Sequence, residues 1–203
     1  MKTEFVPDYK NVELAARNKK APRLPLYEHI ICVELMEEVL GHKFGGLLYG
    51  GYSDKVEYFK NFCEFHRIMG YDSPSFECCI TGALIDGGAL GAHKEGAIKT
   101  MDDFRRYPWD EIEKRYFTYY DEVFRALAEA VPPGMKFVGG VGNGVFECVQ
   151  DLTGYINLCF ISADDPELYE ALFRKIGEIM YRIWERFLSQ PYADAYCVMR
   201  FGD

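Results

Sequence analysis

The chain of 203 residues is long enough to bury a sizeable hydrophobic core as one domain. Apolar residues make up 49% of it, aromatic residues 16% and charged residues 27%, a globular composition that excludes intrinsic disorder. The net charge of −9 gives no electrostatic footprint for nucleic acid or for an anionic membrane surface, so neither partner is expected.

The cysteines and the first residues indicate where the protein is found. The chain has seven cysteines, an odd number at irregular spacings, which is unlike a secreted disulfide framework. The first residues lack an apolar leader, and no apolar run is long enough to span a bilayer. We therefore expect a soluble, cytoplasmic protein with reduced cysteines.

The first part of the chain predicts two helices around one strand. A short helix is expected over residues 11–18, and Pro22 and Pro25 then favour an extended start for a strand over 26–33. The next helix is expected over 34–40, because Gly41 stands where a helix commonly ends.

The middle of the chain predicts a helix, a strand and a long loop. Asp54 opens an apolar pattern of helical spacing that ends at Gly70, a typical terminating glycine. A strand is expected over 71–80, and a glycine-rich loop over 82–96 follows it. A loop of that length is more typical of a functional lid than of a simple connection.

The remaining elements complete an alternating pattern. A helix is expected from Tyr107 to about Val131, and a strand over 135–139 follows it. Asp165 and Pro166 begin the clearest helix, and a last strand is expected over 193–201. The long connections predict parallel strands, with Met135–Gly139 and Ala195–Phe201 as neighbours.

This order predicts an α/β fold of the parallel (β/α) TIM-barrel type. A complete (β/α)₈ barrel needs eight strands, whereas this chain offers four. We therefore expect residues 1–203 to form a single domain, the first half of such a barrel, with an N-terminal helix and a long loop after strand two. An open half-barrel leaves strand edges uncovered, so it is expected to form a homo-oligomer or to pair with a complementary C-terminal half-barrel.

A glycine-rich segment follows the third expected strand. Gly142, Asn143 and Gly144 lie in a run that resembles a phosphate-binding loop, but Val145 stands where a dinucleotide fingerprint needs glycine. The alternative is a sharp turn at the carboxyl end of a strand. In either case these three residues are candidates for substrate binding.

Several polar side chains lie where a barrel carries its chemistry. Glu77, Glu147 and Asp203 fall at or just after strand ends and are candidate catalytic residues, although carboxylates there also cap helices. His29 is expected on the first strand, as a substrate-binding residue or as a core histidine. No spacing typical of a metal site is present, because Cys78 and Cys79 would point to opposite faces of a strand. We expect no metal or other cofactor in this chain.

Five segments together resemble the uroporphyrinogen decarboxylase superfamily, which includes the corrinoid-dependent methyltransferases. The resemblance runs from about Val12 to Asp203 and corresponds to the first half of that family's TIM barrel. The segments are Met69–Asp72, Ile98–Trp109, Pro133–Lys136, Gly142–Glu147 and Asp164–Leu168.

The resemblance implies methyl transfer between a methylcobamide and a thiol or pterin acceptor. A decarboxylase of porphyrin biosynthesis, a lyase, would carry arginines in the segment 25–31, and none is present. The aspartate of the decarboxylases falls at Cys79 or, with a gap, at Glu77, and their tyrosine falls on Gln150, a further candidate for substrate binding. The alternatives are uroporphyrinogen decarboxylase itself or a non-catalytic half-barrel. A complete relative would need the corrinoid. It would also need a zinc ion, bound in the other half of the barrel.

Overall fold

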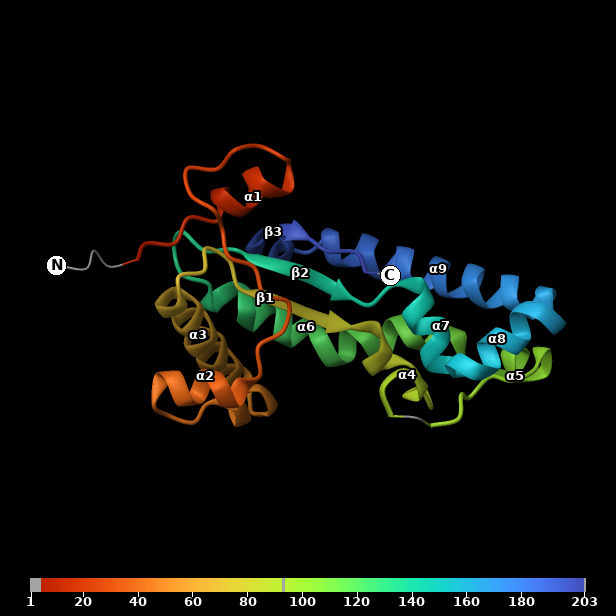
Figure 1. Cartoon of the computed structure of the whole chain (residues 1–203). Helices are drawn as coiled ribbons and strands as arrows, with labels where there is room; N and C mark the ends of the chain where they lie inside the picture. Colours follow the sequence, from red (N-terminus) through yellow and green to blue (C-terminus); the bar gives the residue numbers. More distant parts are fainter. Residues whose placement is uncertain (1–4, 93, 203) are drawn as a thin grey trace. The chain divides into compact units, whose positions relative to one another are not determined.

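The computed structural model describes residues 5–92 and 94–202. Its elements confirm the predicted α/β class and are shown in Figure 1. In chain order they are α1 (Lys10–Ala16), α2 (Val33–Leu40), η1 (Gly45–Tyr49), α3 (Tyr52–Met69), β1 (Ser75–Cys79), η2 (Ile80–Ala83), α4 (Ala89–Ala92), α5 (Met101–Arg106), η3 (Trp109–Glu111), α6 (Ile112–Ala130), β2 (Phe137–Gly142), α7 (Val145–Thr153), α8 (Tyr155–Asp164), α9 (Pro166–Leu188), η4 (Pro191–Ala195) and β3 (Tyr196–Met199).

The chain divides into two compact units, which we describe separately. Unit 1 contains the residues up to Glu77 together with Tyr120–Gly140 and Gln190–Arg200. Unit 2 contains Cys78–Tyr119, Val141–Ser189 and the residues from Phe201 onward.

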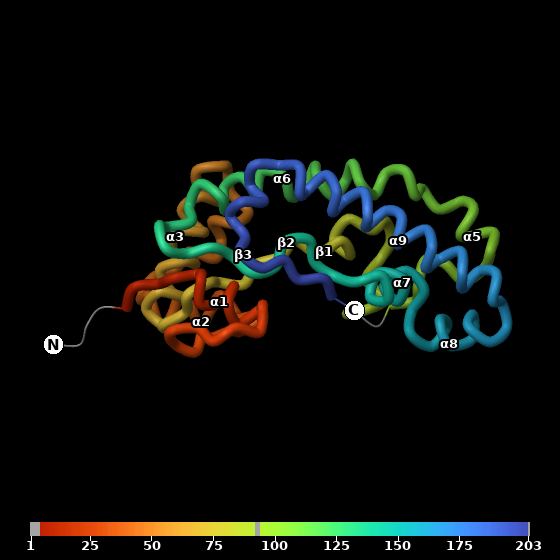
Figure 2. Tube along the Cα trace, turned by 90° about the horizontal axis from the view of Figure 1, so that it is seen from above, coloured from red at the N-terminus to blue at the C-terminus, as the bar shows by residue number. Residues whose placement is uncertain are grey.

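The sheet has three strands in the order β1-β2-β3. β2 and β3 pair in parallel, with Phe137 opposite Tyr196 and Gly139 opposite Met199, which confirms the predicted pair of neighbours. Figure 2 shows these two strands running side by side along the Cα trace. The arrows of β1 and β2 point the same way in Figure 1, so the carboxyl ends of the strands share one edge of the sheet.

The predicted first strand over 26–33 is wrong. These residues form an extended segment without a strand partner in the described part of the chain, and Val33 already begins α2. Leu26, Tyr27 and Ile30 are 46%, 51% and 75% exposed, so little apolar burial drives this segment into a sheet. The described residues therefore hold three strands rather than four.

An aromatic cluster forms the centre of unit 1. Phe59 of α3 meets Phe76 of β1 edge to face, with ring centroids 4.8 Å apart, and meets Phe137 of β2 at 6.1 Å. Tyr196 of β3 packs on Phe137 at 5.9 Å. Large aromatic side chains bury much apolar area, so this cluster holds α3 against all three strands.

The buried carboxylate of Asp72 fastens the N-terminal segment to unit 1. Its side chain is fully buried and accepts hydrogen bonds from the backbone N–H of Asp8 at 2.7 Å and from the Asn11 amide at 3.3 Å. Arg23 forms an ion pair with the same oxygen. A buried charge is stable only when paired and hydrogen-bonded, so these contacts fix α1 and the chain up to Arg23.

Helix α9 is the central helix of the unit 2 core. Its N-terminus is as predicted, because the Asp165 carboxylate accepts from the Leu168 N–H at 3.0 Å and Pro166 occupies the first turn. One apolar face is buried and contacts α5, α7 and α8. The helices α7 and α8, which no sequence pattern above predicts, therefore cover this face.

No helix in the described ranges is long and apolar enough to cross a membrane.

We expect Gly139→Ala to destabilise the protein by about 3 kcal/mol. The backbone φ of Gly139 is +129°, and a Cβ atom there would lie 2.4 Å from the Phe76 carbonyl oxygen of β1. Urea unfolding measures the change, with Gly46→Ala as the control, because a Cβ at Gly46 has no neighbour within 4 Å. Equal effects of the two substitutions would contradict this close approach of β1 and β2.

We also expect stability to fall on acidification because of His66. Its Nδ1–H donates to the Phe62 carbonyl at 2.7 Å, and burial lowers its pKa to about 4 from 6.5. The unfolded chain therefore binds a proton at His66 below about pH 6.5, whereas the folded chain binds it only below about pH 4. Over this window the free energy of unfolding should fall by up to about 3 kcal/mol.

Urea titrations at several pH values measure that loss. His66→Phe should remove this part of the acid-dependent loss, whereas His42→Gln, at an exposed histidine, should retain it. A pH profile unchanged by His66→Phe would contradict the assignment.

Candidate functional site

Two predicted site residues, His29 and Glu77, meet in unit 1 beside Arg200. Glu77 lies on β1, Arg200 follows β3 directly, and His29 lies on the extended segment between Arg23 and α2. Tyr27, from the same segment, adds a weaker interaction with Arg200. We call these four residues the edge cluster, because Glu77 and Arg200 belong to the carboxyl-end edge of the sheet.

Glycines in β2 allow Arg200 to reach Glu77. The Arg200 N–H donates to the Gly139 carbonyl at 3.0 Å and so continues the pairing of β3 with β2. The side chain then extends past the middle strand to β1. Gly139 and Gly140 place no side chain in its way, and both have a positive φ.

The Arg200 guanidinium is the centre of the edge cluster. Its Nη2 donates to both carboxylate oxygens of Glu77, at 2.8 and 3.0 Å, and contacts His29 Nε2 at 3.0 Å. His29 Nε2 lies 3.5 Å from Glu77 Oε1. The side chain of Glu77 is 13% exposed, whereas those of Arg200 and His29 are 36% and 38% exposed, so solvent reaches the cation and the imidazole.

The charges of the edge cluster are balanced. Burial lowers the pKa of Arg200, but the hydrogen bond and the negative charge of Glu77 raise it more, so the guanidinium stays protonated. Its positive charge is compensated by Glu77. An imidazole beside a carboxylate can exchange a proton with a bound substrate, which is the chemistry that this group of side chains can perform.

A second group of predicted residues lies in unit 2, where β2 leads into α7. Asn143 has a left-handed φ of 69°, and its Oδ1 accepts from the N–H and the hydroxyl of Thr81, at 3.2 and 2.9 Å. The Glu147 carboxylate accepts from the Gly144 N–H at 2.8 Å. The Asn143 contacts join η2 to the end of β2, and the Glu147 contact caps α7. The folding of these elements therefore accounts for the positions of Asn143, Gly144 and Glu147.

The other predicted site residues are separate from these contacts. Gly142 is the buried last residue of β2, and Gln150 is a half-buried residue of α7 whose carbonyl accepts from the Gly154 N–H at 2.8 Å. Asp203 lies outside the described residues.

Sequence reasoning missed two side chains that organise these regions. Arg200 could have been found as a charged residue near the carboxyl end of the strand predicted over 193–201. Asp151 of α7 is buried and accepts from the N–H groups of Gly88 and Leu90, at 2.8 and 3.0 Å. The loop predicted as a lid is thus fastened at its centre by one carboxylate, a long-range contact that no local pattern indicates.

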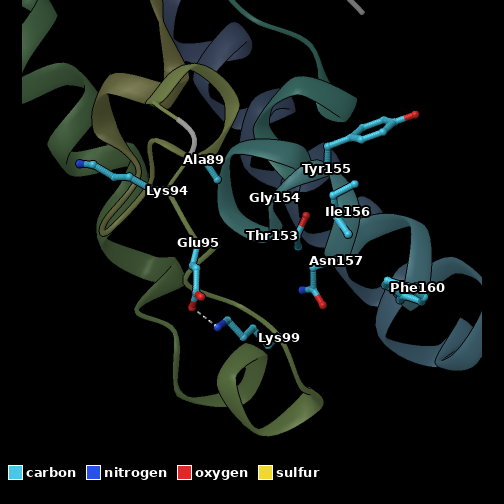
Figure 3. A pocket seen from close by; sticks show the side chains of 11 residues that line it. Ala89, Lys94, Glu95, Lys99, Thr153, Gly154, Tyr155, Ile156, Asn157 and Phe160 are labelled. Carbon is cyan, nitrogen blue, oxygen red and sulfur yellow. Dashed lines mark hydrogen bonds and ion pairs between the residues drawn. The ribbon is translucent and has the colours of Figure 1, made fainter.

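A pocket of about 510 Å³ lies in unit 2 between the segment around α4 and the start of α8 (Figure 3). Ile156 and Phe160 line it with exposed apolar side chains, whereas Lys94, Glu95 and Lys99 supply charge. Glu95 and Lys99 form an ion pair with each other. None of the predicted site residues lines this pocket.

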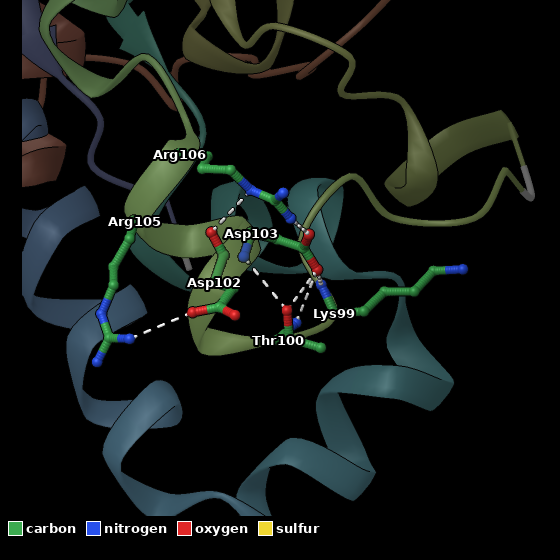
Figure 4. A network of polar contacts seen from close by, with 6 residues as sticks. All are labelled: Lys99, Thr100, Asp102, Asp103, Arg105 and Arg106. Carbon is green, nitrogen blue, oxygen red and sulfur yellow. Dashed lines mark hydrogen bonds and ion pairs between the residues drawn. The ribbon is translucent and has the colours of Figure 1, made fainter.

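Much of the segment Ile98–Trp109, which supports the family resemblance, serves local structure. Thr100 and Asp103 cap α5 reciprocally: the Asp103 N–H donates to the Thr100 hydroxyl at 3.2 Å, and the Thr100 N–H donates to the Asp103 carboxylate at 3.0 Å (Figure 4). The Trp109 indole donates to the Phe104 carbonyl at 2.8 Å. This pattern therefore carries information about folding rather than about chemistry.

Within residues 5–92 and 94–202, no three His, Cys, Asp or Glu side chains come together as a metal site.

Searches against protein-family models, curated proteins and solved structures find no match for this chain.

We expect Glu147→Ala to lower the free energy of unfolding by about 1 kcal/mol, because the Gly144 N–H loses its acceptor. Glu147→Gln keeps an acceptor oxygen and should cost less than half as much. Glu170→Ala is the control, since Glu170 is exposed and pairs with Arg174 of the same helix. Full stability of Glu147→Ala in urea unfolding would contradict the capping role.

Proposed function

We propose that the chain is a uroporphyrinogen decarboxylase-like protein, the first half of a TIM-type barrel, of the corrinoid-linked methyltransferase branch. It would move a methyl group between a methylcobamide and a thiol or pterin acceptor in the cytoplasm. The parallel sheet supports this proposal, as does a cluster of chemically active side chains at its carboxyl edge. In barrels of this type that edge carries the active site.

The balanced charge of the edge cluster is the observation that favours methyl transfer over decarboxylation. Uroporphyrinogen carries eight carboxylates, and recognising them requires several arginines that are free to form bidentate pairs. Arg200 is the arginine of the edge cluster, and Glu77 already compensates its charge. The segment 25–31 adds no other arginine. A small acceptor that carries little charge suits this edge better.

His29 and Glu77 have complementary roles in this proposal. Transfer of a methyl group to a thiol requires removal of the thiol proton, and His29 is the group that would accept it. Glu77 would stabilise the imidazolium that results. The described residues do not assemble a set of zinc ligands, and neither of these roles involves that ion.

A non-catalytic half-barrel that pairs with a partner is the second candidate. The exposed apolar side chains of Leu24, Leu26 and Ile30, all on one extended segment of unit 1, favour it. The partner would be a second copy of the chain or a complementary half-barrel.

Equilibrium dialysis with two ligands separates these possibilities. We expect saturable 1:1 binding of methylcobalamin and no saturable binding of uroporphyrin, a stable octa-carboxylate. The isolated chain should give only background methyl transfer to a simple thiol, because half of the barrel is missing from the proposed active site.

The other binding outcomes would contradict the proposal. Binding of uroporphyrin alone would overturn the proposal in favour of the decarboxylase branch. Binding of neither ligand would overturn it in favour of the non-catalytic half-barrel. Glu170→Ala, an exposed substitution in unit 2, should bind methylcobalamin as the unmodified chain does.

A further inference from the structure

A second pocket, of about 610 Å³, lies within unit 1 and is lined by the start of α3, one face of α6 and the start of η4. A volume of this size is typical of small-molecule sites. Because η4 leads into β3 and Arg200 follows β3, this pocket and the edge cluster lie at opposite ends of that strand. We call it the α6 pocket.

Two contacts hold the walls of the α6 pocket in place. Lys55, in the first turn of α3, forms an ion pair with Glu122 of α6 at 2.9 Å. Tyr192 of η4 is buried, and its ring stacks on that of Phe124 of α6, with centroids 5.2 Å apart. Both other elements are therefore fastened to α6, and a ligand would lose little free energy to ordering the site.

The lining of the α6 pocket carries one negative charge that no cation compensates. Arg125 pairs with Asp121, with 3.0 Å between its Nε and the carboxylate. The Glu129 carboxylate instead accepts from the hydroxyl of Tyr52 at 2.7 Å. This hydrogen bond raises the pKa of Tyr52, so the hydroxyl keeps its proton and stays a neutral donor. Within the described residues, Glu129 therefore has a hydrogen-bond donor but no cationic partner.

The ring of Tyr52 also favours a cation. The guanidinium carbon of Arg125 already lies over this ring, 6.0 Å from its centroid, and aromatic faces attract positive charge. Tyr52 is 37% exposed and Glu129 is exposed, so a ligand can reach both side chains. One uncompensated carboxylate is too few for a calcium or magnesium ion, which takes about six oxygen ligands. An organic cation needs only one such partner for its N–H groups.

We propose that the α6 pocket binds a small organic cation, which donates hydrogen bonds from an ammonium group to Glu129 and packs its apolar part against Tyr52 and Pro191. An ammonium group brings donors and a positive charge, which are the two things that Glu129 lacks there. This site is separate from the edge cluster, so the inference does not depend on the proposed methyl transfer.

NMR titration of the nitrogen-15-labelled full chain tests the site with three probes of similar shape. Benzylammonium, benzyl alcohol and benzoate share a ring but are positively charged, neutral and negatively charged. We expect saturable shifts of the Glu129 and Gln190 backbone N–H signals with benzylammonium. Benzyl alcohol should bind at least about tenfold more weakly, because a hydrogen bond between two charged groups is lost. Benzoate should give no saturable shift.

Substitutions in the same titration identify the recognising group. Glu129→Gln keeps the shape of the side chain and should weaken benzylammonium binding by about tenfold or more. Glu57→Gln removes the same charge from an exposed position of α3, where Glu57 pairs with Lys60, and should bind as the unmodified chain does. Tyr52→Phe keeps the ring and leaves both oxygens of Glu129 to the ligand, so its affinity should be equal or higher.

Saturable binding of benzoate, equal binding of all three probes, or no binding of benzylammonium would overturn the proposal. Unchanged affinity in folded Glu129→Gln would do the same, as would a tenfold loss in folded Tyr52→Phe. Circular dichroism verifies the fold of each variant. The comparison of probes uses the unmodified chain, so it decides the question even if a variant unfolds.

Discussion

The edge cluster depends on one constraint, which is that the side chain of Arg200 must pass a whole strand to reach its carboxylate. Glu77 is on β1 and Arg200 follows β3, with β2 between them. Neighbouring strands are about 4.8 Å apart, so the guanidinium must extend across roughly two such spacings. A side chain at Gly139 would collide with the Phe76 carbonyl, and its absence lets the strands approach closely. Glycine within β2 weakens a strand but permits this ion pair.

The two groups of predicted residues show how similar sequence signals can have different origins. Glu77 and Glu147 both fall at strand ends, where a barrel would place catalytic carboxylates. Glu147 accepts from the backbone at the start of α7, so a helix needs it whatever the protein does. Glu77 instead holds a long-range cation and faces an imidazole. Within the described residues, Glu147 contacts the local backbone, whereas the contacts of Glu77 join β1 to Arg200 and His29.

Local sequence signals predicted local structure well. Gly41 and Gly70 end their helices in the left-handed conformation, and Asp165 caps α9 as expected, because each effect involves neighbours in the chain. The strand over 26–33 failed for the opposite reason. Its residue types favour a strand, but a strand also needs a paired neighbour and a buried face, and neither can be read from the segment itself.

The candidate site was predicted in part. Glu77 was named from its expected position near a strand end and His29 from its place on the expected first strand, and they meet in the edge cluster although His29 is not on a strand. Arg200 was missed because its role arises from pairing with a residue 123 positions earlier. The contacts of Asp151 with Gly88 and Leu90 were missed for the same reason, since they join residues more than 60 positions apart.

The position of His29 on an irregular segment bears on its chemistry. Its segment has no strand partner in the described chain and is fastened near its two ends. Arg23 pairs with buried Asp72 before it. After it, Glu37 accepts from the N–H groups of Phe44 and Gly45, at 2.9 and 2.8 Å.

The ion pair of Glu77 and Arg200, in contrast, joins residues anchored in the sheet. His29 reaches this pair from a segment that forms no strand in the described residues, and such segments are in general more mobile than paired strands. The sheet therefore fixes Glu77 and Arg200, whereas the position of His29 beside them depends on the segment before α2.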